Sequence, residues 1–225
     1  LVAYAQDRFI IVVPEIDIPG HTNAALASYP ELNCDGKIAE LYSGIEVGFS
    51  TLCVDNEITF QFLDDVIREI SAITPGNYFH IGGDESHSTN EEDYIVFIDK
   101  TQDIVEKYGK NVMGWDEIQS SNIKPNTIAQ YWADADNAIG AVKKGAKILM
   151  SPAKYAYLDM QYDSLSKYGF HWASYISIKR GYDWNPDELV EGIADENIIG
   201  VEAPLWSETI SNFEELSYLV KSGFH

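Results

Sequence analysis

Short apolar runs that end in carboxylates or tryptophans recur along this sequence of 225 residues. In the plainest case, an apolar run that begins at Tyr78 passes through two glycines and reaches Asp84 and Glu85. Four further runs end in the same way, at Asp17, Asp116, Asp134 and Glu208. Such runs are typical of buried parallel strands, which deliver polar side chains at their carboxyl ends. The pattern therefore predicts an α/β fold whose functional groups lie along one edge of a sheet.

Longer segments with apolar residues at helical spacing separate these runs. We expect strands near residues 9–16, 78–83, 111–115, 127–132, 146–151 and 198–203. We expect helices at Ile58–Ile73, Tyr94–Tyr108, Ala135–Lys144, Phe213–Lys221 and, shorter, Pro186–Ala194. This alternation implies a parallel sheet covered by helices. Because nearly every strand end carries polar or aromatic residues, a (β/α)8 TIM barrel is favoured over an open sheet, which uses only one crevice.

Six strands are fewer than the eight that a TIM barrel needs. We therefore expect residues 1–225 to form one partial TIM-barrel domain, with about six of the eight βα units present and the first two missing. Three explanations stay open: a fragment of a longer protein, an incomplete sequence, or a chain whose barrel is completed by a second polypeptide segment.

Acidic residues outnumber basic residues by 36 to 15, which gives a formal net charge of −21. This charge argues against nucleic acid as a partner, because phosphate binding needs a basic face. No apolar stretch approaches the roughly 20 residues of a membrane span, and residues 1–15 lack the layout of a signal peptide. Glycine-rich phosphate-binding motifs are also absent from the sequence, which disfavours a nucleotide cofactor.

Two cysteines, Cys34 and Cys53, lie in one polar connecting segment. They form either a disulfide or two free buried thiols, and the polar, glycine-containing loop favours the disulfide. A disulfide there would stabilise the fold by about 3 kcal/mol in the loop-entropy account. It would also indicate an oxidising compartment, such as the periplasm or the outside of the cell.

Six motifs in order along the chain carry a family resemblance: Pro14–His21, His80–Glu85, Gly114–Glu117, Gln130–Trp132, Tyr157–Asp159 and Leu205–Glu208. On these motifs the sequence resembles the catalytic barrel of glycoside hydrolase family 20, the β-N-acetylhexosaminidases. The resemblance implies a retaining exo-hydrolase that removes terminal β-linked N-acetylglucosamine or N-acetylgalactosamine from a glycan or chitooligosaccharide, without a cofactor. The arginine and the acidic residue that the first two strands of the family supply have no counterpart before Pro14.

Most glycosidases place two carboxylates across the bond that they cleave. Asp84 and Glu85 are consecutive, so in a strand their side chains would point to opposite sides and flank one bond poorly. This favours the substrate-assisted route for which family 20 is known, in which the 2-acetamido oxygen attacks C1 and forms an oxazolinium ion. By resemblance, Glu85 is the general acid and base, and Asp84 orients the acetamido N–H. Tyr157 donates to the acetamido oxygen, and His21 belongs to the polar network behind Glu85.

The resemblance also implies a set of sugar-binding residues. Aromatic faces suit the C–H side of a pyranose, and the resemblance gives Trp115, Trp132 and Trp206 this role, with Trp172 on the leaving-group side. Asp159 and Glu208 are expected to accept hydrogen bonds from sugar hydroxyls. The pattern leaves Glu15, Asp17, Glu117 and Glu202 unassigned, and it favours core roles for His80 and Trp184.

Two other classes of function compete with the hydrolase. One is a catalytically incomplete barrel fragment that binds an amino sugar without turnover. The other is a metal-dependent barrel enzyme with strand-end carboxylates as ligands, although only His21 and His80 lie near strand ends. We therefore expect no metal ligands in this chain.

Overall fold

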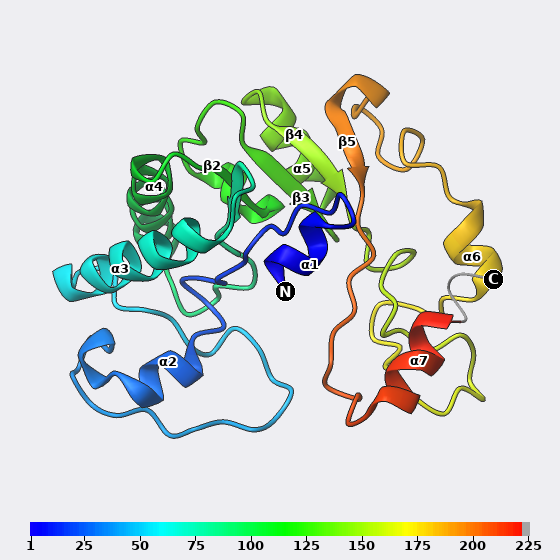
Figure 1. Cartoon of the computed structure of the whole chain (residues 1–225), viewed down its shortest axis with the longest axis horizontal. Helices are drawn as coiled ribbons and strands as arrows, with labels where there is room; N and C mark the ends of the chain where they lie inside the picture. The colour runs from blue at the N-terminus through cyan, green and yellow to red at the C-terminus, as the bar shows by residue number, and fades with distance from the viewer. Residues whose placement is uncertain (222–225) are drawn as a thin grey trace.

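A five-stranded parallel sheet forms the centre of the computed structural model, which describes residues 1–221 (Figure 1). The strands are β1 (Tyr78–His80), β2 (Asn111–Trp115), β3 (Ile128–Tyr131), β4 (Lys147–Met150) and β5 (Ile198–Val201). They pair in chain order, whereas a doubly wound sheet reverses its order at a switch point. The α/β class is confirmed, and the strand order is that of a TIM barrel.

Helices alternate with the strands as the sequence predicts. The three longest helices beside the sheet are α3 (Glu57–Ile73), which precedes β1, α4 (Glu91–Lys107), which connects β1 to β2, and α5 (Ala135–Lys143), which connects β3 to β4. The others are α1 (Val2–Gln6), α2 (Asn23–Ser28), α6 (Ile178–Asp183) and α7 (Phe213–Lys221), with 3-10 turns η1 (Pro30–Leu32), η2 (Asp116–Ser120) and η3 (Asp195–Asn197). Side chains of Asn56, Asn90 and Asp134 cap the first turns of α3, α4 and α5, which fixes where these helices begin.

The main core lies between α3, α4 and the first two strands. Leu63 and Ile67 of α3 and Phe97 of α4 are fully buried with Phe79 of β1. A second core cluster covers β3 and β4 beneath α5. Both clusters cover the outer face of the sheet. The carboxyl ends of the strands are therefore not filled by this packing and can carry the side chains of a site.

The predicted strand at residues 9–16 is wrong as a regular strand. The segment forms a single parallel bridge, between Glu15 and His80. His80 donates its backbone N–H to Pro14 at 2.9 Å, and Ile16 donates to His80 at 3.0 Å, so the segment does follow β1. Proline has no N–H to donate, and residues 9–11 are exposed, so the ladder does not extend.

The predicted helix at Pro186–Ala194 is also wrong. This segment is a series of turns, and the helix α6 lies before it, where Ser177 accepts the backbone N–H of Arg180 at 3.2 Å. Gly192 has a φ of +98°, which a right-handed helix does not allow. The apolar spacing that suggested a helix instead buries Val190 and Ile193 against the second core cluster.

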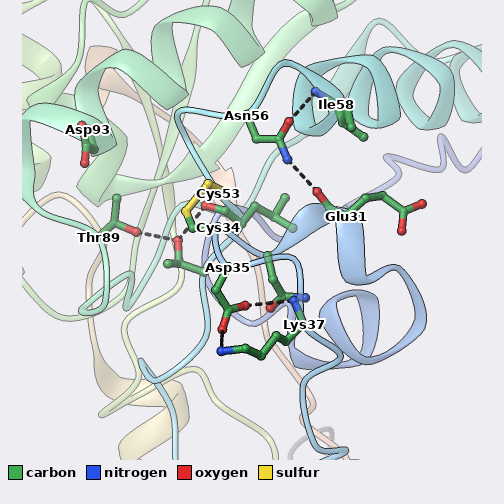
Figure 2. The surroundings of a disulfide bond; sticks show 12 residues. Glu31, Cys34, Asp35, Lys37, Cys53, Asn56, Ile58, Thr89 and Asp93 are labelled. Atoms are coloured by element: carbon green, nitrogen blue, oxygen red, sulfur yellow. Dashed lines mark hydrogen bonds and ion pairs between the residues drawn. A yellow bond between two sulfur atoms is a disulfide. The ribbon is translucent and has the colours of Figure 1, made fainter.

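A disulfide joins Cys34 and Cys53, as the loop composition favours (Figure 2). It closes the base of the long connection between α2 and α3. Beside it, the hydroxyls of Thr51 and Thr89 lie 2.6 Å apart and tie this connection to the segment that follows β1.

Among the residues that the structure describes, none of the helices has the length and apolar character needed to cross a membrane.

Candidate active site

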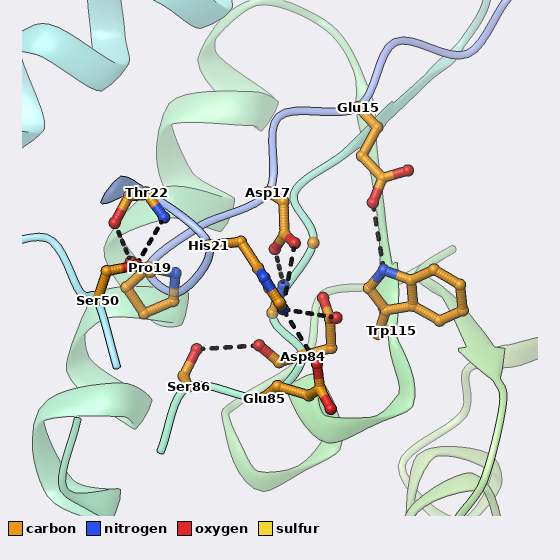
Figure 3. A network of polar contacts seen from close by, with 12 residues as sticks. Glu15, Asp17, Pro19, His21, Thr22, Ser50, Asp84, Glu85, Ser86 and Trp115 are labelled. Carbon is orange, nitrogen blue, oxygen red and sulfur yellow. Dashed lines mark hydrogen bonds and ion pairs between the residues drawn. The ribbon is translucent and has the colours of Figure 1, made fainter. Parts of the chain in front are cut away.

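Two adjacent carboxylates and one imidazole form the polar centre of the site (Figure 3). His21 Nε2 lies 3.3 Å from Asp84 Oδ2 and 3.3 Å from Glu85 Oε2. Hydrogen bonds to Asp84 and then Glu85 raise the pKa of His21 to about 10, so the imidazole is cationic at neutral pH. The predicted place of His21 in the network behind Glu85 agrees with this geometry.

The turn after β1 brings both acids to the same nitrogen. β1 ends at His80, and Gly82, Gly83 and Glu85 have φ values of +68°, +102° and +49°. This left-handed backbone breaks the alternation of a strand. The expectation that Asp84 and Glu85 point to opposite sides is therefore wrong, since the predicted strand ends three residues too late.

Asp17 closes the polar centre from the segment beside β1. Its Oδ1 accepts the backbone N–H of Gly83 at 3.2 Å, and its Oδ2 lies 3.9 Å from His21 Nε2. Burial raises the pKa of Asp17 to about 9, and the negative charge of Asp84 adds to this shift. Asp17 is thus a neutral acid at neutral pH. A Cβ at position 82 would lie 1.8 Å from Asp17 Oδ1, so glycine is a steric requirement there.

Asp17, His21 and Asp84 also offer three ligand-type atoms within 4.8 Å of one another. Sequence reasoning missed this cluster, because the residues come from two segments more than 60 positions apart. Metal ligands must be deprotonated, and the pKa values of Asp17 and His21 are raised, so a metal ion at this cluster would have to displace both protons.

An arc of aromatic rings lies beside the polar centre. Neighbouring ring centroids are 6.0–6.3 Å apart along the series Trp132, Trp172, Tyr157, Trp206 and Trp115. These spacings are typical of packed aromatic pairs. Figure 3 shows Trp115, the last ring of this series, with its indole N–H directed at Glu15. All five residues were predicted as site residues, and the structure brings them together as one aromatic wall.

Two predicted acceptors of sugar hydroxyls come from two connections. Asp159 lies in the long loop after β4, and Glu208 lies in the segment after β5. Asp159 is 2% exposed, and its Oδ1 has no hydrogen-bond partner among the described residues. Burial raises the pKa of Asp159 to about 6, and the charge of Glu208 contributes in the same direction. Glu208 itself is exposed. A buried carboxylate oxygen without a donor can accept a hydrogen bond from a ligand.

Two carboxylates without an assigned role hold tryptophans of the aromatic wall. Glu15 Oε1 accepts the indole N–H of Trp115 at 3.2 Å, and Glu117 accepts the indole N–H of Trp132 with both oxygens at 3.2 Å. The first pair is 100 positions apart in the chain, so no local pattern connects its members. The second pair could be inferred from the pairing of neighbouring strands, once the register is known.

The core roles expected for His80 and Trp184 are confirmed. His80 is 3% exposed, and its Nε2 lies 3.1 Å from Gln130 Oε1. Gln130 in turn donates to Glu202 at 2.9 Å, which places Glu202 in a network beneath the site. Trp184 packs against the second core cluster.

This fold and this site define a class: a barrel-type α/β domain with paired acids beside an aromatic wall at the carboxyl edge of its sheet. The chain belongs to glycoside hydrolase family 20. The sequence profile of the glycosyl hydrolase family 20 catalytic domain matches residues 1–95 and 87–221. The resemblance carried by the six motifs is thereby confirmed.

Individual relatives agree with this family. A beta-N-acetylhexosaminidase of Cellulomonas fimi is 44% identical over 216 residues, which are 95% of this chain and 44% of the relative. The solved family 20 beta-N-acetylhexosaminidase of Streptomyces coelicolor A3(2) has a TM-score of 0.96 and 47% identity, over 99% of this chain and 46% of that one. The Streptomyces plicatus N-acetyl-beta-hexosaminidase in complex with thio-NAglucal has the same TM-score, identity and coverage. The chain thus spans less than half the length of these relatives.

Proposed function

We propose that the protein acts as a retaining exo-β-N-acetylhexosaminidase on a glycan or chitooligosaccharide with a terminal N-acetylglucosamine or N-acetylgalactosamine. The observation that carries this proposal is the convergence of Asp84 and Glu85 on His21, beside the aromatic wall. Similar structures support the sugar class. The Streptomyces plicatus enzyme was solved with thio-NAglucal and, as a mutant, with the product GlcNAc.

The arrangement of the acids favours a nucleophile that belongs to the substrate. Each acid places one oxygen 3.3 Å from the same nitrogen, so these oxygens are at most twice that distance apart. An inverting enzyme needs about 6.5–9.5 Å between its carboxyl groups, with a water between them. A retaining enzyme with its own nucleophile needs the two groups on opposite sides of the bond. Here both acids approach one imidazole from adjacent residues, which suits attack by the 2-acetamido oxygen.

In the first step, Glu85 gives its proton to the leaving oxygen while the acetamido oxygen forms a bond to C1 and the glycosidic C–O bond breaks. Asp84 accepts the acetamido N–H and stabilises the positive charge that develops on the oxazolinium ring. Tyr157 donates its hydroxyl proton in a hydrogen bond to the acetamido oxygen. Burial raises the pKa of Tyr157 above its ordinary value, so it remains a donor throughout the working range.

In the second step, Glu85 takes a proton from a water that attacks C1 and opens the oxazolinium ring. Two displacements at C1 leave the anomeric configuration retained. During both steps Trp115, Trp132 and Trp206 pack against the sugar and its acetamido group, with Trp172 on the leaving-group side. Asp159 and Glu208 accept hydrogen bonds from ring hydroxyls.

We further propose that residues 1–225 are one partial TIM-barrel domain with about six of the eight βα units. The sheet order and the coverage of less than half of the relatives support this proposal. A further segment of polypeptide would then complete the barrel. The disulfide supports a secreted, periplasmic or otherwise oxidising location.

The decisive experiment compares the complete parent protein with this 225-residue chain. Release of an aryl leaving group is measured from the β-N-acetylglucosaminide and from the plain β-glucoside, with and without a thiazoline analogue of the oxazolinium ion. Cleavage of the N-acetyl sugar alone, blocked by the thiazoline, is the expected result. Equal cleavage of both sugars would contradict participation by the acetamido group.

The same assay separates the competing functions. Thiazoline binding without turnover in either protein would favour an amino-sugar-binding domain. Loss of activity in a chelator, with recovery on adding a divalent cation, would favour a metal site at Asp17, His21 and Asp84.

A further inference from the structure

Glu117 and Trp132 meet because of the register between two neighbouring strands. β2 and β3 are parallel, and Trp115 pairs with Gln130 at the carboxyl end of the ladder. Two residues farther along each segment lie Glu117, in the first turn of η2, and Trp132. Both oxygens of Glu117 accept the Trp132 indole N–H at 3.2 Å. The contact therefore links the ends of two strands at the edge where the site lies.

A buried acid, Asp116, directly precedes Glu117 in the chain and lies close enough for their charges to interact. Asp116 is completely buried, and burial together with the charge of Glu117 raises its pKa to about 9. Asp116 Oδ1 accepts a hydrogen bond from Asn137 at 3.4 Å, while Oδ2 is buried without a hydrogen-bond partner among the described residues.

We propose that Glu117 is a positioning residue, which fixes the plane of the Trp132 indole and thereby sets how tightly the site binds the acetamido group of its substrate. This inference rests on the proposed function and adds a residue to it. Glu117 touches no reacting atom. It acts through Trp132, whose ring packs 6.2 Å from Trp172, which packs 6.0 Å from Tyr157.

Removing Glu117 would free the Trp132 ring to turn about its side-chain bonds. The indole N–H would lose both carboxylate oxygens, and a change in ring tilt would pass to the neighbouring ring of Trp172. A misplacement of about 1 Å in a binding wall can cost on the order of 10²-fold in rate. The effect should fall on affinity for the oxazolinium-like state, because that state places the acetamido group against the wall.

The test uses the full-length parent protein with four variants: Glu117→Ala, Glu117→Gln, Trp132→Phe and the double variant Glu117→Ala/Trp132→Phe. Glutamine keeps one oxygen that can accept the indole N–H, whereas phenylalanine keeps a ring but removes the N–H. Glu69→Ala, at an exposed position of α3, is the matched control. Each protein is titrated to its active fraction, and kcat, KM and the inhibition constant of the thiazoline are measured.

We expect Glu117→Ala to weaken thiazoline inhibition and kcat/KM by about 10- to 100-fold. Glu117→Gln should recover most of this loss, and the double variant should be no worse than Trp132→Phe alone. A purely structural role would instead lower the active fraction and leave the inhibition constant per active site unchanged. That result, or additive losses in the double variant, would overturn the proposal.

A spectroscopic measurement separates this proposal from the proposed function. In protein labelled with ¹⁵N at the indole nitrogens, the signal of Trp132 is the one that Trp132→Phe removes. Glu117→Ala should shift this signal and speed its exchange with solvent, while Glu117→Gln should change it little. An unshifted signal in Glu117→Ala would overturn the contact whether or not the protein cleaves the N-acetyl sugar. A shifted signal in a protein without this activity would show that Glu117 contacts Trp132 but would contradict a role for that contact in this reaction.

Discussion

The polar centre and the aromatic wall are built in different ways. His21, Asp84 and Glu85 come from two short segments in which left-handed turns set the directions of the side chains. The aromatic wall draws Trp115, Trp132, Trp172, Tyr157 and Trp206 from strand ends and long irregular connections. Backbone geometry therefore fixes the acids, while contacts among side chains fix the rings.

Two tryptophans of the aromatic wall depend on polar partners as well as on ring packing. Glu15 accepts the indole N–H of Trp115, and Glu117 accepts the indole N–H of Trp132. An indole that is packed but not held can still rotate. We therefore expect substitutions of Asp84 or Glu85 to change the reaction rate with little movement of neighbouring side chains. Substitutions among the aromatic rings should change both the position of the rings and the affinity for substrate.

The largest effect is expected for Glu85→Gln in the polar centre. Glutamine keeps the size of the side chain but has no proton to give to the leaving oxygen. We expect turnover of an unactivated glycoside to fall by roughly 10²–10⁴-fold. Thiazoline affinity should change little, because the turn and His21 remain in place. Steady-state kinetics on an unactivated N-acetylglucosaminide will check this, and turnover equal to that of the unmodified protein would remove Glu85 from its role.

Tyr157→Phe tests the hydrogen bond that we propose between Tyr157, in the aromatic wall, and the acetamido oxygen. The ring stays, but the hydroxyl that faces the developing charge is lost, so we expect kcat to fall by about 10²-fold. The measurement is kcat for an aryl N-acetylglucosaminide beside the control Tyr182→Phe, at a residue that is 85% exposed. Equal kcat values in both variants would mean that Tyr157 serves only to pack.

Gly82→Ala tests whether the backbone sets the polar centre. A Cβ at Gly82 would overlap Asp17, and its φ is +68°. Gly109 has a similar φ of +71° but open space around it, so Gly109→Ala is the matched control. We expect Gly82→Ala to lower the free energy of unfolding by about 2 kcal/mol more than Gly109→Ala. Urea unfolding of the full-length protein measures the difference, and equal losses would rule out the steric argument.

The smallest effect is expected in the pH dependence of binding through Asp159. Its pKa is raised to about 6, so it is protonated below that pH and ionised above it. Ionisation restores both oxygens as acceptors, so KM for a neutral substrate should fall as the pH rises through about 6. The change should be about 5-fold, as one hydrogen bond is worth about 1 kcal/mol. Asp159→Asn should remove this dependence, and its persistence would assign the transition to another group, such as Glu117, whose pKa is also about 6.

Much of the fold was predictable from the sequence. The periodicity of α3 and α4 and the apolar runs of β2, β3 and β4 match the structure closely, since these elements bury one face or both. The strand at 9–16 was wrong because residues 9–11 are exposed and Pro14 has no N–H for a ladder, and the helix at Pro186–Ala194 was wrong because Gly192 has a left-handed backbone. The glycines after Ile81 were included in the predicted strand at 78–83, whereas the structure places them in a left-handed turn.

The sequence was sufficient to predict which residues belong to the site. It was not sufficient to predict which of these residues contact one another. Asp84, Glu85 and the tryptophans follow strand ends, where the class of fold places functional groups. The roles of Glu15 and Glu117 depend on which strands pair and in what register. Neither property is present in the local sequence, so these residues stayed unassigned.

The disulfide-closed connection has a consequence for how the protein can be redesigned. Its base is fastened by Cys34–Cys53, by Thr51 to Thr89 and by Ser50, which accepts the backbone N–H of Thr22 at 3.1 Å. Its outer part is largely solvent-exposed, with Ile38 70% and Leu41 74% exposed. Lengthening such a loop costs little entropy once its ends are fixed. Residues 43–46, which are all exposed, are therefore a place for insertions or grafted peptides that would leave His21 and Glu85 where they are.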